Sequence, residues 1–172
     1  MPTLAVRSGT QEWAEAARLL FIKRQYSKAM DAFERADLPQ ERRVSLAYNL
    51  REQARAAPVI TRGKDLSQSA AFAKAAEAFV DAVPGAPKLE DQQAYYRIAA
   101  ECYVRSGNNG KAGAAYRDAG QYTLAATHFR KAGMFDEAVA VVQSHGQEVD
   151  PDVSQSIVNV SKLYYIKENK LA

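Results

Sequence analysis

A short pattern recurs along the chain: an alanine, an aromatic residue four positions later, and a second alanine three positions after that. Its four copies are Ala29/Phe33/Ala36, Ala75/Phe79/Ala82, Ala112/Tyr116/Ala119 and Ala125/Phe129/Ala132. Positions i, i+4 and i+7 lie on one face of an α-helix, so each copy places a ring between two small residues where another helix can approach closely. The pattern therefore predicts a stack of helices, none of which buries its apolar face alone.

Apolar periodicity, capping residues and chain breakers divide the sequence into nine expected helices. Thr10 is the expected N-cap of the first helix, Pro58 ends the third, and Asp65 with Gln68 has the spacing of a capping box before the fourth. Asp150 and Pro151 are expected to open the last helix. The other expected ranges are about 10–24, 26–36, 39–57, 66–83, 88–106, 109–118, 121–131 and 135–145.

The C-terminal half has a tighter rhythm than the N-terminal half. Gly107, Gly120 and Gly133 follow one another at intervals of 13 residues. Glycine adopts positive φ readily and is common just after the end of a helix. The spacing predicts helices of about ten residues joined by three-residue turns.

The segment Pro84-Gly85-Ala86-Pro87 is the strongest breaker in the chain. It divides the sequence into N-terminal helical hairpins (1–83), a breaker loop (84–87) and C-terminal helical repeats (88–172). The end of the last helix, 163–167, aligns with 19–23 at the end of the first helix, so we expect the array to be truncated at Ala172. The apolar residues left uncovered there predict either self-association through that end or loose packing of the last helix.

Two hairpins resemble the tetratricopeptide repeat. The first places Trp13, Ala16, Ala17 and Leu20 at first-helix positions and Ala29, Phe33 and Ala36 at second-helix positions; the other places Tyr96, Ala99, Ala100 and Tyr103, then Ala112, Tyr116 and Ala119. Alanine replaces the first-helix glycine in both, and the spacing of later helices is shorter. The resemblance implies an all-α fold, an irregular tetratricopeptide-like solenoid of about nine antiparallel helices.

Residues 98–107 and 129–138 also resemble the helical region of large proteins similar to tetratricopeptide and ankyrin repeat-containing protein 1, which carry a UvrD/Rep-like helicase-type ATPase module elsewhere in the chain. The matching positions are packing residues. The resemblance therefore implies a segment of a larger helicase-like protein, and it transfers no catalytic residue.

Composition favours an ordinary folded domain: 47% of the 172 residues are apolar and 25% are charged. No apolar run approaches the roughly 20 residues of a membrane span, and no secretory signal precedes the first helix. The lone Cys102 cannot form an internal disulfide. We expect an intracellular protein, cytoplasmic or nuclear, without membrane contact.

Catalytic and metal-binding patterns are incomplete. The stretch from Arg105 to Lys111 lacks the first glycine and the hydroxyl of a phosphate-binding loop, and the stretch after Asp150 lacks the glycine and glutamate of a calcium loop. The two histidines, His128 and His145, have no partner at zinc-ligand spacing. We expect no enzyme activity in this segment, and no cofactor or metal.

Partner binding is the better expectation. Tetratricopeptide proteins commonly hold partners along the face lined by the first helix of each pair. That rule selects Gln11, Ala14, Arg18 and Phe21 in the first hairpin and Arg97, Glu101, Val104 and Arg105 in the later one, of which the candidate partner-binding residues are Arg18, Arg97, Glu101 and Arg105. Arg18 and Glu101 stand where a carboxylate clamp has asparagine, so we expect no clamp for an acidic C-terminal tail. The alternative for Arg97, Glu101 and Arg105 is a ladder of ion pairs at i,i+4 spacing on a solvated face.

One stretch is locally basic although the net charge is only +3. Against a single acid, Glu52, it carries Arg42, Arg43, Arg51, Arg55, Arg62 and Lys64. These residues are either a solvated helix face with a loop or a surface that guides nucleic acid for an attached helicase module. The preferred hypothesis is a non-catalytic scaffold for a protein or peptide partner, or for other domains of the same chain; nucleic-acid binding is the alternative.

Overall fold

The computed structural model describes residues 4–57 and 66–168, with side chains from residue 9 onward except that of Leu66. Within these residues the chain is all-helical and contains no strand. The α-helices are α1 (Leu4–Ile22), α2 (Tyr26–Arg35), α3 (Pro39–Ala56), α4 (Leu66–Ala82), α5 (Leu89–Arg105), α6 (Asn109–Asp118), α7 (Tyr122–Lys131), α8 (Phe135–His145) and α9 (Pro151–Lys167), and a short 3-10 turn, η1, covers Val83–Gly85.

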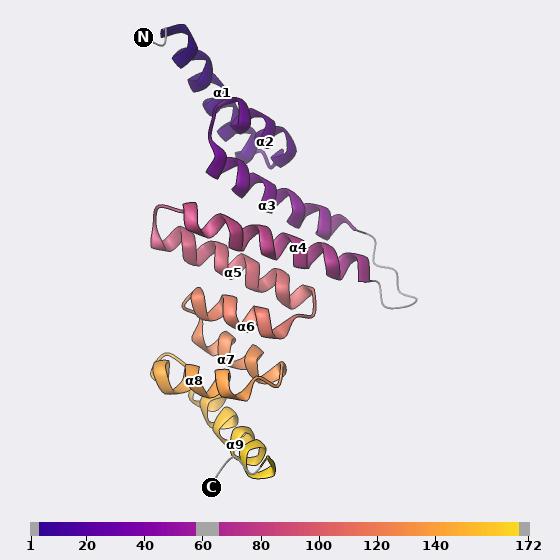
Figure 1. Ribbon diagram of the computed structural model, residues 1–172, viewed down its shortest axis with the longest axis vertical. Coiled ribbons are helices and arrows are strands. Elements are labelled where there is room, and N and C mark those ends of the chain that lie inside the picture. Colours follow the sequence, from indigo (N-terminus) through magenta and orange to yellow (C-terminus); the bar gives the residue numbers. More distant parts are fainter. Residues whose placement is uncertain (1–3, 58–65, 169–172) are drawn as a thin grey trace.

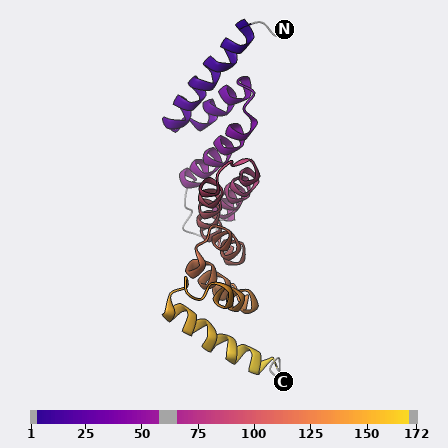
Figure 2. The ribbon, with the colours of Figure 1, turned by 90° about the vertical axis from the view of Figure 1, so that its left-hand side faces the viewer.

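The helices stack in chain order into an elongated solenoid (Figure 1). Each α-helix packs on the next one along the sequence, and α7 also contacts α9. The view turned by 90° shows a slender molecule with α1 and α9 at opposite extremes (Figure 2). The expected all-α solenoid is confirmed.

The aromatic residue and the first alanine of each copy lie in the interior, as their spacing predicts: Phe33, Phe79, Tyr116 and Phe129 are all buried, and so are Ala29, Ala75, Ala112 and Ala125. The second alanine is buried in the first two copies, whereas Ala119 is half-buried and Ala132 is exposed. One core cluster runs continuously from Ala47 to Ile157 and so includes residues on both sides of the 84–87 segment. A smaller cluster around Phe33 joins α1 to α2. The division of the chain at 84–87 stays a prediction.

Five turns between helices share one geometry. In each, a residue with φ between 55° and 80° follows the helix end, at Arg24, Asp37, Gly107, Gly120 and Gly133. The next amide then donates to the carbonyl five residues earlier, as in Gln121 N to Tyr116 O at 2.8 Å. The three glycines confirm the expected 13-residue rhythm. The same interval separates Arg24 from Asp37, so the rhythm also governs the first hairpin without glycine.

The start of the first helix was predicted wrongly. α1 begins at Leu4, so Thr10 lies inside the helix and does not cap it. No residue between Leu4 and Gly9 breaks a helix, and Gly9 is tolerated within it. The expected cap Asp65 lies outside the described residues. Its proposed partner Gln68 instead donates to the carbonyl oxygens of Ala54 and Ala57, at 3.3 and 3.4 Å, and so ties α4 to the end of α3.

Candidate functional site

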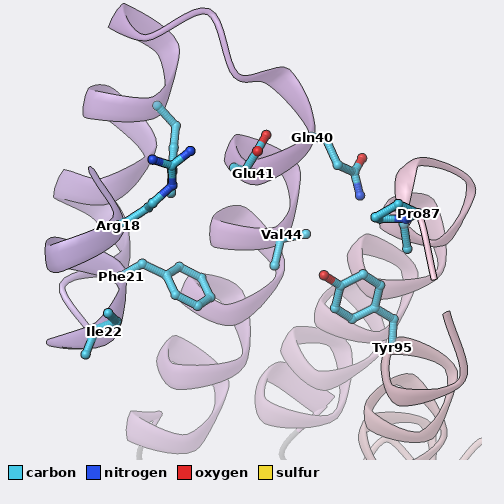
Figure 3. A pocket seen from close by; sticks show the side chains of 10 residues that line it. Arg18, Phe21, Ile22, Gln40, Glu41, Val44, Pro87 and Tyr95 are labelled. Atoms are coloured by element: carbon cyan, nitrogen blue, oxygen red, sulfur yellow. The ribbon is translucent and has the colours of Figure 1, made fainter. Parts of the chain in front are cut away.

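An apolar hollow of about 410 Å³ opens between α1, α3 and the start of α5. Phe21 and Tyr95 point into it from opposite walls, with Val44 between them (Figure 3). Arg18 and Glu41 bring charge to its edge. The remaining lining residues are Ile22, Phe33, Gln40, Ala86 and Pro87.

Packed rings form a rigid floor beside this hollow. The ring of Tyr48 lies 5.3 Å from that of Phe21 and 5.0 Å from that of Phe79, both edge to face, and it stacks on Tyr26 at 5.3 Å. Phe79 in turn lies 6.4 Å from Tyr95. Burial raises the pKa of Tyr48 and of Tyr95, so both hydroxyl groups stay neutral at physiological pH. Because each ring is held by its neighbours, the hollow is preformed.

The segment 84–87, the breaker in the sequence, completes the wall of the hollow. Gln40, in the first turn of α3, donates from Nε2 to the carbonyl oxygen of Ala82 at 2.7 Å. This bond fixes the end of α4 and places Ala86 and Pro87 against the hollow. Sequence reasoning missed this arrangement, because the proline-glycine segment indicated only a turn. The rule for the partner-binding face did select Arg18 and Phe21, which line the hollow, but not Tyr95 or the residues of the breaker.

Arg51 on α3 is held over the same rings. Its guanidinium carbon lies 4.8 Å from the Tyr48 centroid and 5.9 Å from that of Phe79, within cation–π range. Its side chain is only 16% exposed. Glu52 accepts contacts from both Arg51 and Arg55, at 3.6 and 3.0 Å. Arg51 therefore connects the aromatic floor to an ion-pair cluster.

Residues from both candidate surfaces converge near Cys102 on α5. Burial raises the pKa of this thiol to about 11, and the positive charges of Arg51, Arg55 and Arg105 partly oppose that rise. Arg105 is itself held over the ring of Phe72 at 4.7 Å. The charge of Arg97 also lowers the pKa of Tyr48, but by less than the charge of Arg51 does. The arginine cluster is defined as Arg51 and Arg55, which share one face of α3, and Arg97 and Arg105, which share one face of α5.

The other residues of the two predicted surfaces lie apart from the arginine cluster or outside the residues that the structure describes. Arg18 is on α1 at the edge of the hollow, away from the arginine cluster. Arg42 pairs with Glu34 of α2 at 3.6 Å, and Arg43 is exposed on α3. Arg62 and Lys64 lie outside the described residues. In the described part of the chain, no ion pair within 4 Å joins Glu101 to Arg97 or Arg105.

The segments that resemble ligand loops serve as helix ends. Asn108 Oδ1 accepts from Lys111 N at 3.0 Å, and Asp150 Oδ1 accepts from Asp152 N at 2.9 Å, so both are N-caps. Among residues 9–57 and 67–168 no group of three histidine, cysteine or acidic side chains is placed to hold a metal ion. Within the same part of the chain, no helix combines the length and apolar content that crossing a bilayer requires.

The last helix leaves some apolar side chains uncovered. Leu163 is 69% exposed and Ile166 is also exposed. Tyr164 instead packs on Phe135 at 4.9 Å, and the Tyr165 hydroxyl donates to Asp136 of α8. Self-association through this helix stays a prediction.

The fold and site together define an all-α solenoid with a preformed apolar hollow next to an arginine cluster. No protein-family model, no curated protein and no solved structure matches the chain. The geometry of this surface is therefore the basis for a proposed function.

Proposed function

We propose that the chain is a non-catalytic helical-repeat scaffold that binds a protein segment, or another domain of the same polypeptide, on the surface formed by α1, α3 and α5. The apolar hollow carries this proposal. Buried rings and aliphatic groups line it, and Ile22 at its edge is 74% exposed. When a partner covers exposed apolar surface of this kind, the free energy of binding becomes more favourable by about 25 cal/mol for each Å² removed from water.

The dimensions and rigidity of the hollow suit side chains of a peptide or protein loop. About 410 Å³ accommodates two or three large apolar side chains. Because Phe21, Tyr48 and Phe79 are already packed against one another, binding does not have to order the receiving surface. The resemblance to helicase-associated helical regions supports a place within a larger intracellular protein, where the partner is either separate or an adjoining domain.

One observation favours nucleic-acid binding as a second candidate. The arginine cluster carries four guanidinium groups, two on one face of α3 and two on one face of α5. Binding of phosphates to these groups depends steeply on salt, with a log-log slope of about −0.7 to −0.9 per phosphate neutralised. A titration with a single-stranded oligonucleotide at several salt concentrations tests this candidate.

Selection from a random peptide library displayed on phage tests the scaffold proposal. The informative variant is Ile22→Glu, which places a charge at the edge of the hollow on an exposed position. Leu163→Glu is the matched control, because Leu163 is equally exposed but lies on α9. Thermal melting of both variants confirms that the fold is retained.

We expect the wild-type chain and Leu163→Glu to enrich the same peptides, and Ile22→Glu to lose them. Enrichment that is indifferent to Ile22→Glu, or no enrichment at all, contradicts the proposal.

A further inference from the structure

The hollow and the arginine cluster are continuous through one side chain, Tyr48. Its ring contacts Phe21, which lines the hollow, at 5.3 Å. Arg51 lies over the same ring at 4.8 Å. A partner that fills the hollow and continues along α3 therefore meets guanidinium groups immediately beyond the aromatic floor.

The charge along this surface is positive. Its basic residues are Arg18, Arg51, Arg55, Arg97 and Arg105, and its acidic residues are Glu41, Glu52, Asp91 and Glu101. Glu52 is shared by two arginines. Among the described residues, no carboxylate lies within 4 Å of Arg18 or Arg97. These two side chains are free to accept carboxylates from a partner.

We propose that the occupant is an acidic protein segment that inserts a bulky apolar side chain between Phe21, Val44 and Tyr95 and places its carboxylates on Arg97 and Arg105. Arg18 receives a further carboxylate at the other edge of the hollow. This inference rests on the scaffold function proposed above and specifies the chemistry of the partner. The segment needs no free C-terminus, since the charges lie along the groove.

The ring packing favours a protein over a nucleic acid. Tyr48 stacks on Tyr26 and has Arg51 above its ring, so it offers no open face to a base. The planar guanidinium of Arg105, already held over Phe72 at 4.7 Å, can bind a carboxylate through two parallel hydrogen bonds at little conformational cost.

Peptides from the Ile22-dependent selection provide the probes. Their affinities are measured by fluorescence polarisation for the wild-type chain, Arg97→Gln and Arg105→Gln. The matched control is Arg117→Gln. Like Arg105, Arg117 lies over a phenylalanine ring, that of Phe129 at 6.0 Å, but Arg117 is on α6 and so is not part of the proposed binding surface. A single-stranded oligonucleotide of about 20 nucleotides is the competing probe, long enough to cover one or more single-strand binding sites.

We expect the peptides to carry aspartate or glutamate next to a large apolar residue. Arg97→Gln and Arg105→Gln should each weaken binding about three- to tenfold, whereas Arg117→Gln leaves it unchanged. Raising the salt concentration from about 0.05 to 0.5 M should weaken the same complexes, because the charges at the edge of the groove become screened.

The results that would contradict the acidic-segment inference differ from those that would contradict the scaffold function. Ile22-dependent peptides that lack acidic residues, or that bind equally to Arg97→Gln and Arg105→Gln, overturn this inference and leave the scaffold function standing. No Ile22-dependent peptide overturns both. Direct binding of the labelled oligonucleotide that is lost in Arg97→Gln but kept in Ile22→Glu assigns the cluster to nucleic acid, provided that the oligonucleotide also displaces the peptide from the wild-type chain at a lower concentration than unlabelled peptide does.

Discussion

The ring of Phe129 on α7 occupies the space that a side chain on Gly113 would fill. A Cβ atom built at position 113 would lie 2.7 Å from Phe129 Cδ1 and 2.9 Å from Cγ. Phe129 is fully buried, and its neighbours are the core residues of α6 and α7. The glycine inside α6 is therefore a packing residue that lets α6 and α7 approach closely.

Gly113→Ala should destabilise the protein although alanine is the better helix former. The gain in helix propensity is about 1 kcal/mol, while overpacking a well-filled core costs about 1–3 kcal/mol. The buried ring of Phe129 cannot move aside without displacing other core residues, so we expect a net loss of about 1 kcal/mol. Urea unfolding of the variant measures this loss.

The control for that substitution is Gly9→Ala in α1. An added Cβ at Gly9 meets no atom within 4 Å, so only helix propensity acts there. This variant should gain up to about 1 kcal/mol. If Gly113→Ala raised the free energy of unfolding as much as Gly9→Ala does, the ring of Phe129 would have to move aside without cost, and the packing role of Gly113 would be contradicted.

The turn after α2 should be stabilised by Asp37→Gly. Asp37 adopts φ 55°, a conformation that costs a residue with a Cβ atom about 1 kcal/mol or more. Glycine removes that strain but adds freedom to the unfolded chain, so we expect a net gain of up to about 1 kcal/mol. The reciprocal variant is Gly107→Ala, at φ 80° with no atom near its Cβ, and it should lose a comparable amount in the same urea assay. Equal stability of all three proteins contradicts this account.

These turns also show what the sequence could reveal about the fold. Glycine marks three of the five αL positions, and the aromatic residues that repeat at 13-residue intervals mark the matching helix ends, so most helix boundaries could be predicted. The positive-φ positions 24 and 37 could not be recognised in the sequence, because Arg24 and Asp37 occupy them in place of glycine and the fold tolerates the resulting backbone strain. The beginning of α1 was missed because a helix can start without a recognisable cap.

The candidate site was less accessible to sequence reasoning. The periodicity identified Phe33 as a helix-face residue, but the hollow depends on Gln40 holding the carbonyl of Ala82, a contact across 42 positions. The arginine cluster likewise combines residues about 50 positions apart. Local spacing predicts which face a residue occupies, whereas the neighbour across the groove is fixed only when the helices stack.

Cys102 should be chemically inert in the folded protein. Its pKa of about 11 leaves about one thiolate in a thousand at pH 8, and its side chain is buried. We expect no reaction with an aromatic disulfide reagent until urea unfolds the chain. Adding an exposed thiol with Ser144→Cys should give one fast-reacting group per molecule. Two fast groups in that variant would show that Cys102 is open to solvent.

The stability of the α6–α7 pair should depend on the protonation of His128. This side chain is buried, stacks on Tyr116 at 5.4 Å, and has Nδ1 2.9 Å from Asn109 Oδ1. The neutral ring with a proton on Nδ1 donates to that oxygen. Burial lowers the pKa of His128, and the positive charge of Lys131 lowers it further.

Because the folded pKa lies below the unfolded value of about 6.5, the unfolded chain binds the proton more readily at mildly acidic pH. The contribution of His128 is therefore complete above pH 6.5 and is lost as the pH falls toward the folded pKa. The free energy of unfolding should decrease between pH 7.5 and 5.5, by at most about 1.4 kcal/mol per pH unit for this one group. His128→Gln can still donate to Asn109 and does not titrate, so its urea-unfolding free energy should fall less over the same range. Parallel pH dependences for the two proteins would exclude His128 as the titrating group.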